Sequence, residues 1–211
     1  MSRLILIDND ALLKLGRYGL IDESVALFGC ISIDVRVLAT AKYSLLPAKN
    51  RLRLCKDEES AARLEAFFRT SNPLDAGSAD PDLLDALNAI QNIDAGESLL
   101  LAVGATNRST LVITGDKRAL AALCSHESVA QAASALAGRV VSMEVLFSHL
   151  VEHQFAHIQE RVRAKPDVDK ALSIAFGVTA PAALESVQEA LASYTSHLRA
   201  VTGVLLYAPD G

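Results

Sequence analysis

Carboxylates stand at three points of this sequence where a fold built on parallel strands would bring them together. Asp8 ends one apolar run of strand length, and Asp116 follows a second one. Asp94 and Glu97 open the stretch that leads into this second run. Carboxylates crowded at one edge repel each other, so such a group normally requires a cation. Oxygen ligands alone favour Mg²⁺ or Mn²⁺, and the chemistry that fits such an ion is hydrolysis of a phosphate ester.

Apolar runs of strand length alternate with helical patterns over the first 145 residues. The expected strands span residues 3–7, 30–34, 110–114 and 139–142. The expected helices begin near residues 11, 35, 58, 82, 97 and 117, and the second of them ends at residue 46. This alternation predicts an α/β fold, a three-layer sandwich with a central parallel sheet. Sites in such sheets gather at the carboxyl ends of the strands, where Asp8 and Asp116 stand.

Residues 146–211 have a different pattern, and we interpret them as a helical extension of a domain formed by residues 1–145. Apolar side chains recur there every three or four residues, as on one face of a helix. They are Phe147, Val151, Phe155, Ile158 and Val162, followed by Leu184, Val187, Leu191, Tyr194, Leu198 and Val201. We expect these faces to pack on the sandwich or on a partner chain.

The composition is that of an ordinary globular chain. Of its 211 residues, 51% are hydrophobic and 21% are charged, and the net charge is −5. These values exclude an intrinsically disordered chain. The longest apolar run is far shorter than the roughly 20 residues that span a bilayer, so no membrane partner is expected. Three widely spaced cysteines form neither a disulfide framework nor a zinc pair, and we therefore expect a cytoplasmic protein.

One stretch is locally basic although the whole chain is acidic. Residues 42–56 contain no acid and five basic residues, which are Lys42, Lys49, Arg51, Arg53 and Lys56. Two interpretations stay open for this stretch. It is either a solvated loop or a patch that contacts the phosphate backbone of a nucleic acid.

Each acid also has a simple structural explanation when it is taken alone. Asp8 can cap a helix, Asp94 can end one, and Glu97 is favourable on a first helical turn. Capping explains the combination of Asp8, Glu97 and Asp116, in this order and context, much less easily.

Three segments of the chain resemble the PIN-domain family of ribonucleases. They are Ile7–Leu13 (IDNDALL), Asp94–Ser98 (DAGES) and Val112–Lys117 (VITGDK). In that family an Asp ends the first strand, an Asp-x-Gly-Glu-like element opens a helix, and a Thr-x-Asp follows a late strand. The acids bind Mg²⁺ or Mn²⁺ and the enzyme cuts single-stranded RNA. The resemblance covers about residues 3–145 and leaves the helical extension outside it.

The resemblance implies a role for each matching residue. Asp8, Glu97 and Asp116 become the catalytic metal ligands. Asp94 becomes a neighbouring or substitute ligand, and Thr114 orients the last acid or a water. The implied activity is metal-dependent endonucleolytic hydrolysis of RNA, with the basic residues of 42–56 on the RNA backbone.

The sequence departs from the family at one position of the site. The family usually has a Glu in the helix after the second strand, but no acid occurs here between residues 35 and 46. Asp34, just before that stretch, is a candidate substitute. The missing acid supports an alternative, a PIN-like binding or assembly protein impaired in catalysis. Its partner would be an antitoxin-like protein, as toxin members of the family have, or a second copy of this chain.

Two weaker patterns complete the set of hypotheses. Residues 6–13, with Asp8 and Asp10, also resemble the first motif of haloacid-dehalogenase-type phosphatases, but Leu120 stands where that family has a further late acid. His149, His153 and His157 have a spacing that can chelate a metal on one helix. A polar helix stripe is the simpler explanation of these histidines.

Overall fold

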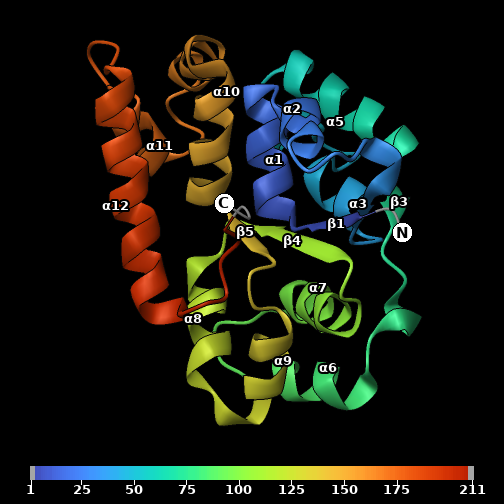
Figure 1. Ribbon diagram of the computed structural model, residues 1–211. Coiled ribbons are helices and arrows are strands. Elements are labelled where there is room, and N and C mark those ends of the chain that lie inside the picture. Colours follow the sequence, from blue (N-terminus) through green and yellow to red (C-terminus); the bar gives the residue numbers. More distant parts are fainter. Residues whose placement is uncertain (1–2, 209–211) are drawn as a thin grey trace.

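The computed structural model describes residues 3–208 and has a five-stranded, all-parallel sheet at its centre. Its strands are β1 (Leu4–Ile7), β2 (Val35–Val37), β3 (Asn72–Pro73), β4 (Thr110–Thr114) and β5 (Val140–Ser142). The order across the sheet is β3-β2-β1-β4-β5. Helices cover both faces (Figure 1), so the predicted α/β sandwich with a parallel sheet is confirmed.

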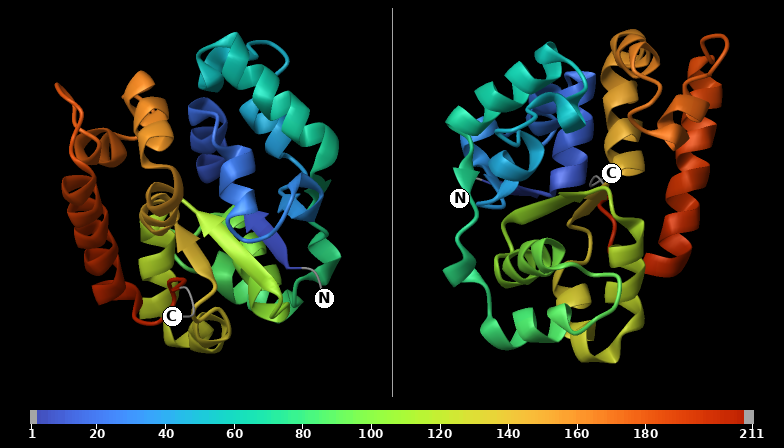
Figure 2. Two further views of the ribbon diagram at one scale, coloured as in Figure 1. Left: turned by 45° about the horizontal axis from the view of Figure 1, so that its top comes forward. Right: turned by 180° about the vertical axis from the view of Figure 1, so that it is seen from behind.

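The helices lie in two layers, one on each face of the sheet. In chain order they are α1 (Asn9–Tyr18), α2 (Ile21–Ala26), α3 (Ala41–Leu45), α4 (Leu52–Cys55), α5 (Glu58–Thr70), α6 (Pro81–Asn88), α7 (Ala95–Thr106), α8 (Lys117–Ser125), α9 (Ala130–Ala135), α10 (Met143–Ala164), α11 (Lys170–Ala175) and α12 (Leu184–Thr202). Helices α1, α2, α5 and α10 lie on one face of the sheet, and α6, α7, α8 and α9 lie on the other (Figures 1 and 2).

The central strands form where the sequence is continuously apolar. Strand β1 pairs with β2 on one side and with β4 on the other, so Ile5 lies between Val35 and Leu111. A strand that is covered by helices on both faces needs apolar side chains at every position, which explains the uninterrupted run in β1 and β4. Both strands occupy residues within the ranges predicted for them. The chain runs outward from β1 to β3 and then returns to β4, so its direction across the sheet reverses between β1 and β4.

The second predicted strand and the helix after it were wrong. Residues 32–34 form a 3₁₀ turn instead of a strand, because the Asp34 carboxylate accepts a hydrogen bond from the Ile31 amide at 3.0 Å. The strand forms at Val35–Val37, where apolar side chains alternate with Arg36 and pair with β1. The helix expected over residues 35–46 is reduced to the five residues of α3.

The C-terminal helices pack on the sandwich within the same chain. Helix α10 begins directly after β5, and α12 contacts both α10 and α8. The chain then returns to the edge of the sheet, where Leu206 forms a parallel bridge with Val140. Most side chains of the two predicted apolar stripes are buried, although Val201 is exposed. In residues 3–208 no helix is both long enough and apolar enough to cross a membrane.

Candidate functional site

A depression with a volume of about 570 Å³ lies at the carboxyl edge of the sheet, next to the ends of β1 and β4. Five acidic and two basic side chains are among those that line it: Asp8, Asp10, Asp94, Glu97, Asp116, Lys117 and Arg118. We call it the acid-lined depression. Its place between β1 and β4 is the point at which the chain reverses direction, where open parallel sheets form their ligand crevices. The four acids predicted from the sequence therefore lie around one cavity.

Asp8 is the most buried of these acids, with 6% of its surface exposed. Its Oδ1 accepts a hydrogen bond from the Ala11 amide at 2.6 Å, which caps α1. Its Oδ2 accepts from the Gly115 amide at 2.9 Å and from the Thr114 hydroxyl. Burial raises the pKa of Asp8 in spite of these hydrogen bonds, which favour the ionised form. Asp8 therefore ties β1 to the chain after β4.

Asp94 and Glu97 hold the start of α7 through a reciprocal pair of hydrogen bonds. The Glu97 amide donates to Asp94 Oδ1 and the Asp94 amide donates to Glu97 Oε2, each at 2.8 Å. This is a capping box, so part of their chemistry is structural. Burial, together with the negative charges of Asp94, Asp116 and Asp8, raises the pKa of Glu97 to about 7. Capping alone does not explain why three other carboxylates lie near that of Glu97.

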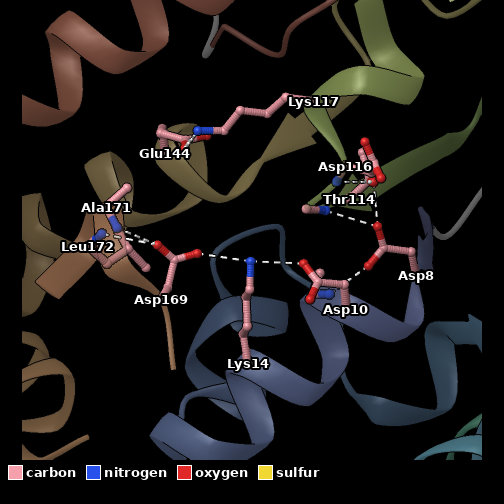
Figure 3. A network of polar contacts seen from close by, with 12 residues as sticks. Asp8, Asp10, Lys14, Thr114, Asp116, Lys117, Glu144, Asp169, Ala171 and Leu172 are labelled. Carbon is pink, nitrogen blue, oxygen red and sulfur yellow. Dashed lines mark hydrogen bonds and ion pairs between the residues drawn. The ribbon is translucent and has the colours of Figure 1, made fainter. Parts of the chain in front are cut away.

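Asp116 caps α8 and is linked to Asp8 through Thr114. Its Oδ1 accepts from the amides of Arg118 at 2.8 Å and Ala119 at 3.1 Å. Burial alone would raise the pKa of Asp116, but these amides and the Arg118 guanidinium lower it overall. The Thr114 oxygen accepts from the Asp116 amide at 3.1 Å while its hydroxyl donates to Asp8 (Figure 3). Thr114 therefore orients two acids at once.

The donor set of the depression suits a hard cation, because all the candidate ligands are oxygens. Within residues 3–208, Glu97 Oε1 accepts no hydrogen bond, and the buried Asn9 Oδ1 has no partner. In the same part of the chain, however, no group of three or more His, Cys, Asp or Glu side chains could hold one metal ion. Mg²⁺ usually needs only one or two carboxylates and takes its other oxygens from water and substrate phosphate. The residues fit an ion of that kind, and they do not form an all-protein cage.

Leu38 lies in the stretch where the family resemblance implies a further acid, and its side chain is apolar. Leu38 directly follows β2 and lines the acid-lined depression. It packs so closely on the start of α7 that a methyl group at Gly96 would meet Leu38 Cδ1 at 2.7 Å. Asp34, the candidate substitute, precedes β2 and therefore lies at the opposite, amino edge of the sheet. The prediction that Asp34 replaces the missing acid was wrong.

Two lysines near the depression are already held by other acids. The Lys14 ammonium lies between Asp10 Oδ2 at 2.8 Å and Asp169 Oδ2 at 2.9 Å. Lys117 forms an ion pair with the buried Glu144, at the start of α10 (Figure 3). Sequence reasoning assigned no role to Lys14, Lys117, Glu144 or Asp169. The i, i+4 spacing of Asp10 and Lys14 was a usable signal, whereas nothing local points to Asp169 or Glu144.

The basic stretch is not uniformly available to a nucleic acid. Arg51 is engaged by two carboxylates of α5, because its Nε lies 2.6 Å from Glu65 and its Nη1 pairs with Glu58. The other four basic residues of the stretch are exposed: Lys42, Lys49, Arg53 and Lys56. None of the five basic residues lines the acid-lined depression.

The three histidines do not share a site in the described chain. Helix α10 departs from helical geometry at Gln154, between His153 and His157, so the regular i, i+4, i+8 arrangement is lost. His149 faces Glu152 at 3.4 Å, and His157 faces Glu23 on α2 at 3.3 Å. This fits the interpretation of a polar helix stripe. For the phosphatase hypothesis, Leu120 is buried in the core and supplies no late acid.

Comparisons of the chain with protein-family models, with curated proteins and with solved structures gave no match. What the fold and the site define is an α/β protein with an acid-lined depression at the switch point of a parallel sheet. The function has to be argued from that depression.

Proposed function

We propose that this protein is a metal-dependent endoribonuclease of the PIN type that hydrolyses phosphodiester bonds in single-stranded RNA. One observation carries the proposal: Asp8, Asp94, Glu97 and Asp116 lie around a single depression at the switch point of the sheet. Helix capping accounts for each aspartate singly. Capping does not require the three helix starts to converge, nor does it require burial and the like charges of Asp94, Asp116 and Asp8 to raise the pKa of Glu97 to about 7.

In this proposal the residues of the depression have separate tasks. Glu97 and Asp116 hold Mg²⁺ or Mn²⁺, and Asp8, fixed by Thr114 and two backbone amides, adds the buried negative charge behind them. When bound, the ion polarises the phosphoryl group and acidifies water. The Arg118 side chain, 82% exposed at the rim, binds the RNA phosphate beside the site.

The proposal is tested by measuring Mn²⁺ binding by calorimetry and cleavage of a labelled single-stranded RNA on the same samples. Asp116→Asn keeps a residue that can cap α8, and we expect it to lose cleavage at least about 100-fold while it stays folded. The double variant Asp8→Ala/Asp116→Ala should bind no Mn²⁺. The matched control is Asp80→Asn, because Asp80 caps α6 through the Leu83 amide at 3.0 Å and does not line the depression. Full cleavage by Asp116→Asn would exclude the assigned site.

A second candidate function is a PIN-like binding or assembly protein that has lost its chemistry. It is favoured by Leu38 at the position of the missing acid and by the incomplete ligand set of residues 3–208. Its partner would be an antitoxin-like protein or a second copy of the chain. A Leu38→Glu variant separates the two candidates. If the wild type neither binds Mn²⁺ nor cleaves RNA but Leu38→Glu binds Mn²⁺, the fold is of the nuclease type and the natural chain is the binding protein.

A further inference from the structure

One lysine joins the C-terminal extension to the rim of the acid-lined depression. The Lys14 ammonium contacts Asp10 on its own helix at 2.8 Å and Asp169, about 150 residues further along the chain, at 2.9 Å. Only 19% of the Lys14 side chain and 15% of the Asp169 side chain are exposed. Asp169 is held in turn, because its Oδ1 accepts from the amides of Ala171 and Leu172 at 2.9 and 3.1 Å (Figure 3).

The other end of this chain of contacts reaches the site. The Asp10 carboxylate lies directly against Gly115, where the carbon of any larger residue would overlap Asp10 Oδ2 and would also lie 3.6 Å from the Lys14 ammonium. The Gly115 amide donates to Asp8, and Asp116 follows it. Each link from Asp169 to Lys14, Asp10 and Gly115 is therefore a direct contact.

We propose that Lys14 is a positioning residue of the acid-lined depression: Asp169 of the C-terminal extension fixes its ammonium, which holds the Asp10 carboxylate against Gly115. Asp10 thereby has a largely buried counter-ion built into the fold, whereas Asp116 meets only the exposed guanidinium of Arg118, at 3.5 Å. The other acids keep their negative charge for an external cation, which is the part of the inference that rests on the proposed function. The C-terminal extension then completes the site instead of merely covering the sandwich.

Burial and charge support this role for Lys14. Burial alone would lower the pKa of Lys14, but the two carboxylates raise it overall, so the ammonium is charged at neutral pH. Removing either carboxylate partner of this partly buried ammonium is expected to destabilise the fold, because the charge is then less well compensated. A neighbouring ion pair provides a control, since Arg17 of α1 contacts Asp167 at 2.6 Å. This pair joins the same two segments, but Arg17 has no counterpart of Asp10, the partner of Lys14 that lines the depression.

The first test needs neither metal nor RNA. The amide resonance of Gly115 is recorded by ¹H–¹⁵N NMR in the full chain, as wild type and as Asp169→Asn, Lys14→Met and Asp167→Asn. Asp169→Asn keeps an oxygen for the Ala171 and Leu172 amides, so α11 should remain capped. We expect the Gly115 resonance to shift in Asp169→Asn and in Lys14→Met, and to stay unchanged in Asp167→Asn. An unchanged Gly115 resonance in folded Asp169→Asn and Lys14→Met would overturn the inference.

The second test asks whether Asp169 acts through Lys14. Removing a positive charge near the carboxylates should tighten Mn²⁺ binding in Lys14→Met by on the order of fivefold, even if the thermal stability falls. A purely structural role would lower stability without tightening the binding. In Lys14→Met/Asp169→Asn the second substitution should add nothing to the effect on Mn²⁺ affinity. If no variant binds Mn²⁺ while the Gly115 resonance shifts as expected, the proposed function fails and the positioning role of Lys14 stands.

Discussion

The two edges of the same sheet carry opposite charges and use them differently. The carboxyl edge has the acid-lined depression, whereas a cavity of about 340 Å³ at the amino edge is lined by Arg3, Arg108 and Arg139. Arg139 donates to the backbone carbonyls of Gly104, Asn107 and Thr110 at 2.9 to 3.0 Å, and also to that of Ala135. The guanidinium of Arg139, the most buried charged group of this cavity, is therefore bound by backbone carbonyls.

The architecture of parallel sheets explains why the charges divide in this way. Helices that follow or precede parallel strands start at the carboxyl edge and end at the amino edge. Their first turns present unpaired amides, which attract carboxylates, and their last turns present carbonyls, which attract arginine. Asp8, Asp94 and Asp116 cap α1, α7 and α8 in this sense. What distinguishes the carboxyl edge is that a further carboxylate, Glu97, is crowded among these caps.

The largest effect on stability is expected at the amino edge. Arg139→Met removes the donor that satisfies several carbonyls at the ends of α7 and α9, and we expect a loss of about 3 kcal/mol in the free energy of unfolding. Denaturant unfolding measures this loss. The control is Arg108→Met, whose side chain is exposed and which should change stability by less than about 0.5 kcal/mol. Equal effects of both substitutions would contradict the contrast between a used and an unused charge.

A smaller loss is expected from removing the most buried acid of the carboxyl edge. Asp8→Ala leaves the Ala11 and Gly115 amides without their acceptor, but it also removes a carboxylate that burial disfavours. We therefore expect a net loss of about 2 kcal/mol by denaturant unfolding, and less for Asp8→Asn, which keeps an oxygen for the helix cap. A stabilised Asp8→Ala would mean that Asp8 is retained for function at a cost to the fold.

The crowding of Glu97 gives a pH dependence of known sign. Its pKa is raised from 4.5 to about 7, so between these values the folded state binds more protons than the unfolded state, and stability falls as the pH rises. Glu97→Gln removes the titrating group and keeps an oxygen for the Asp94 amide. We expect it to be about 1 kcal/mol more stable than the wild type at pH 8, after allowance for solvent screening, and to lose this advantage at pH 4. Thermal unfolding at the two pH values checks this, and an advantage that persists at pH 4 would refute it.

The smallest effects are expected in the basic stretch, where the structure separates one arginine from its neighbours. Lys49→Ala removes an exposed charge, and we expect it to weaken RNA binding slightly and to reduce the slope of log affinity against log salt by roughly 0.7. Arg51→Ala should leave this slope unchanged, because the Arg51 guanidinium already pairs with Glu58 and Glu65. Binding measured at several salt concentrations tests both. A larger effect of Arg51→Ala than of Lys49→Ala would mean that these ion pairs open for RNA.

Much of the sheet could be predicted from the sequence, and the failures have a physical cause. Strands β1 and β4 were predicted well because a strand buried on both faces needs a continuous apolar run, which is a local signal. Strand β2 was misplaced because it has only three residues, and its position is set by pairing with β1. Strand β3, of two residues, and the helix α4 in the basic stretch left no signal strong enough to be predicted.

The sequence by itself determined the residue types of the site, because the residues that cap helices and end strands are chosen by local hydrogen bonding. It therefore indicated Asp8, Asp94, Glu97 and Asp116 correctly as members of one depression. Only the tertiary structure decided which charged side chains at the depression have ion-pair partners within the fold. Lys14 reaches Asp169 across about 150 residues, and the apolar side chain of Leu38 lines the depression beside the acids. Contacts of that kind depend on how distant segments pack, and no local pattern in the chain encodes them.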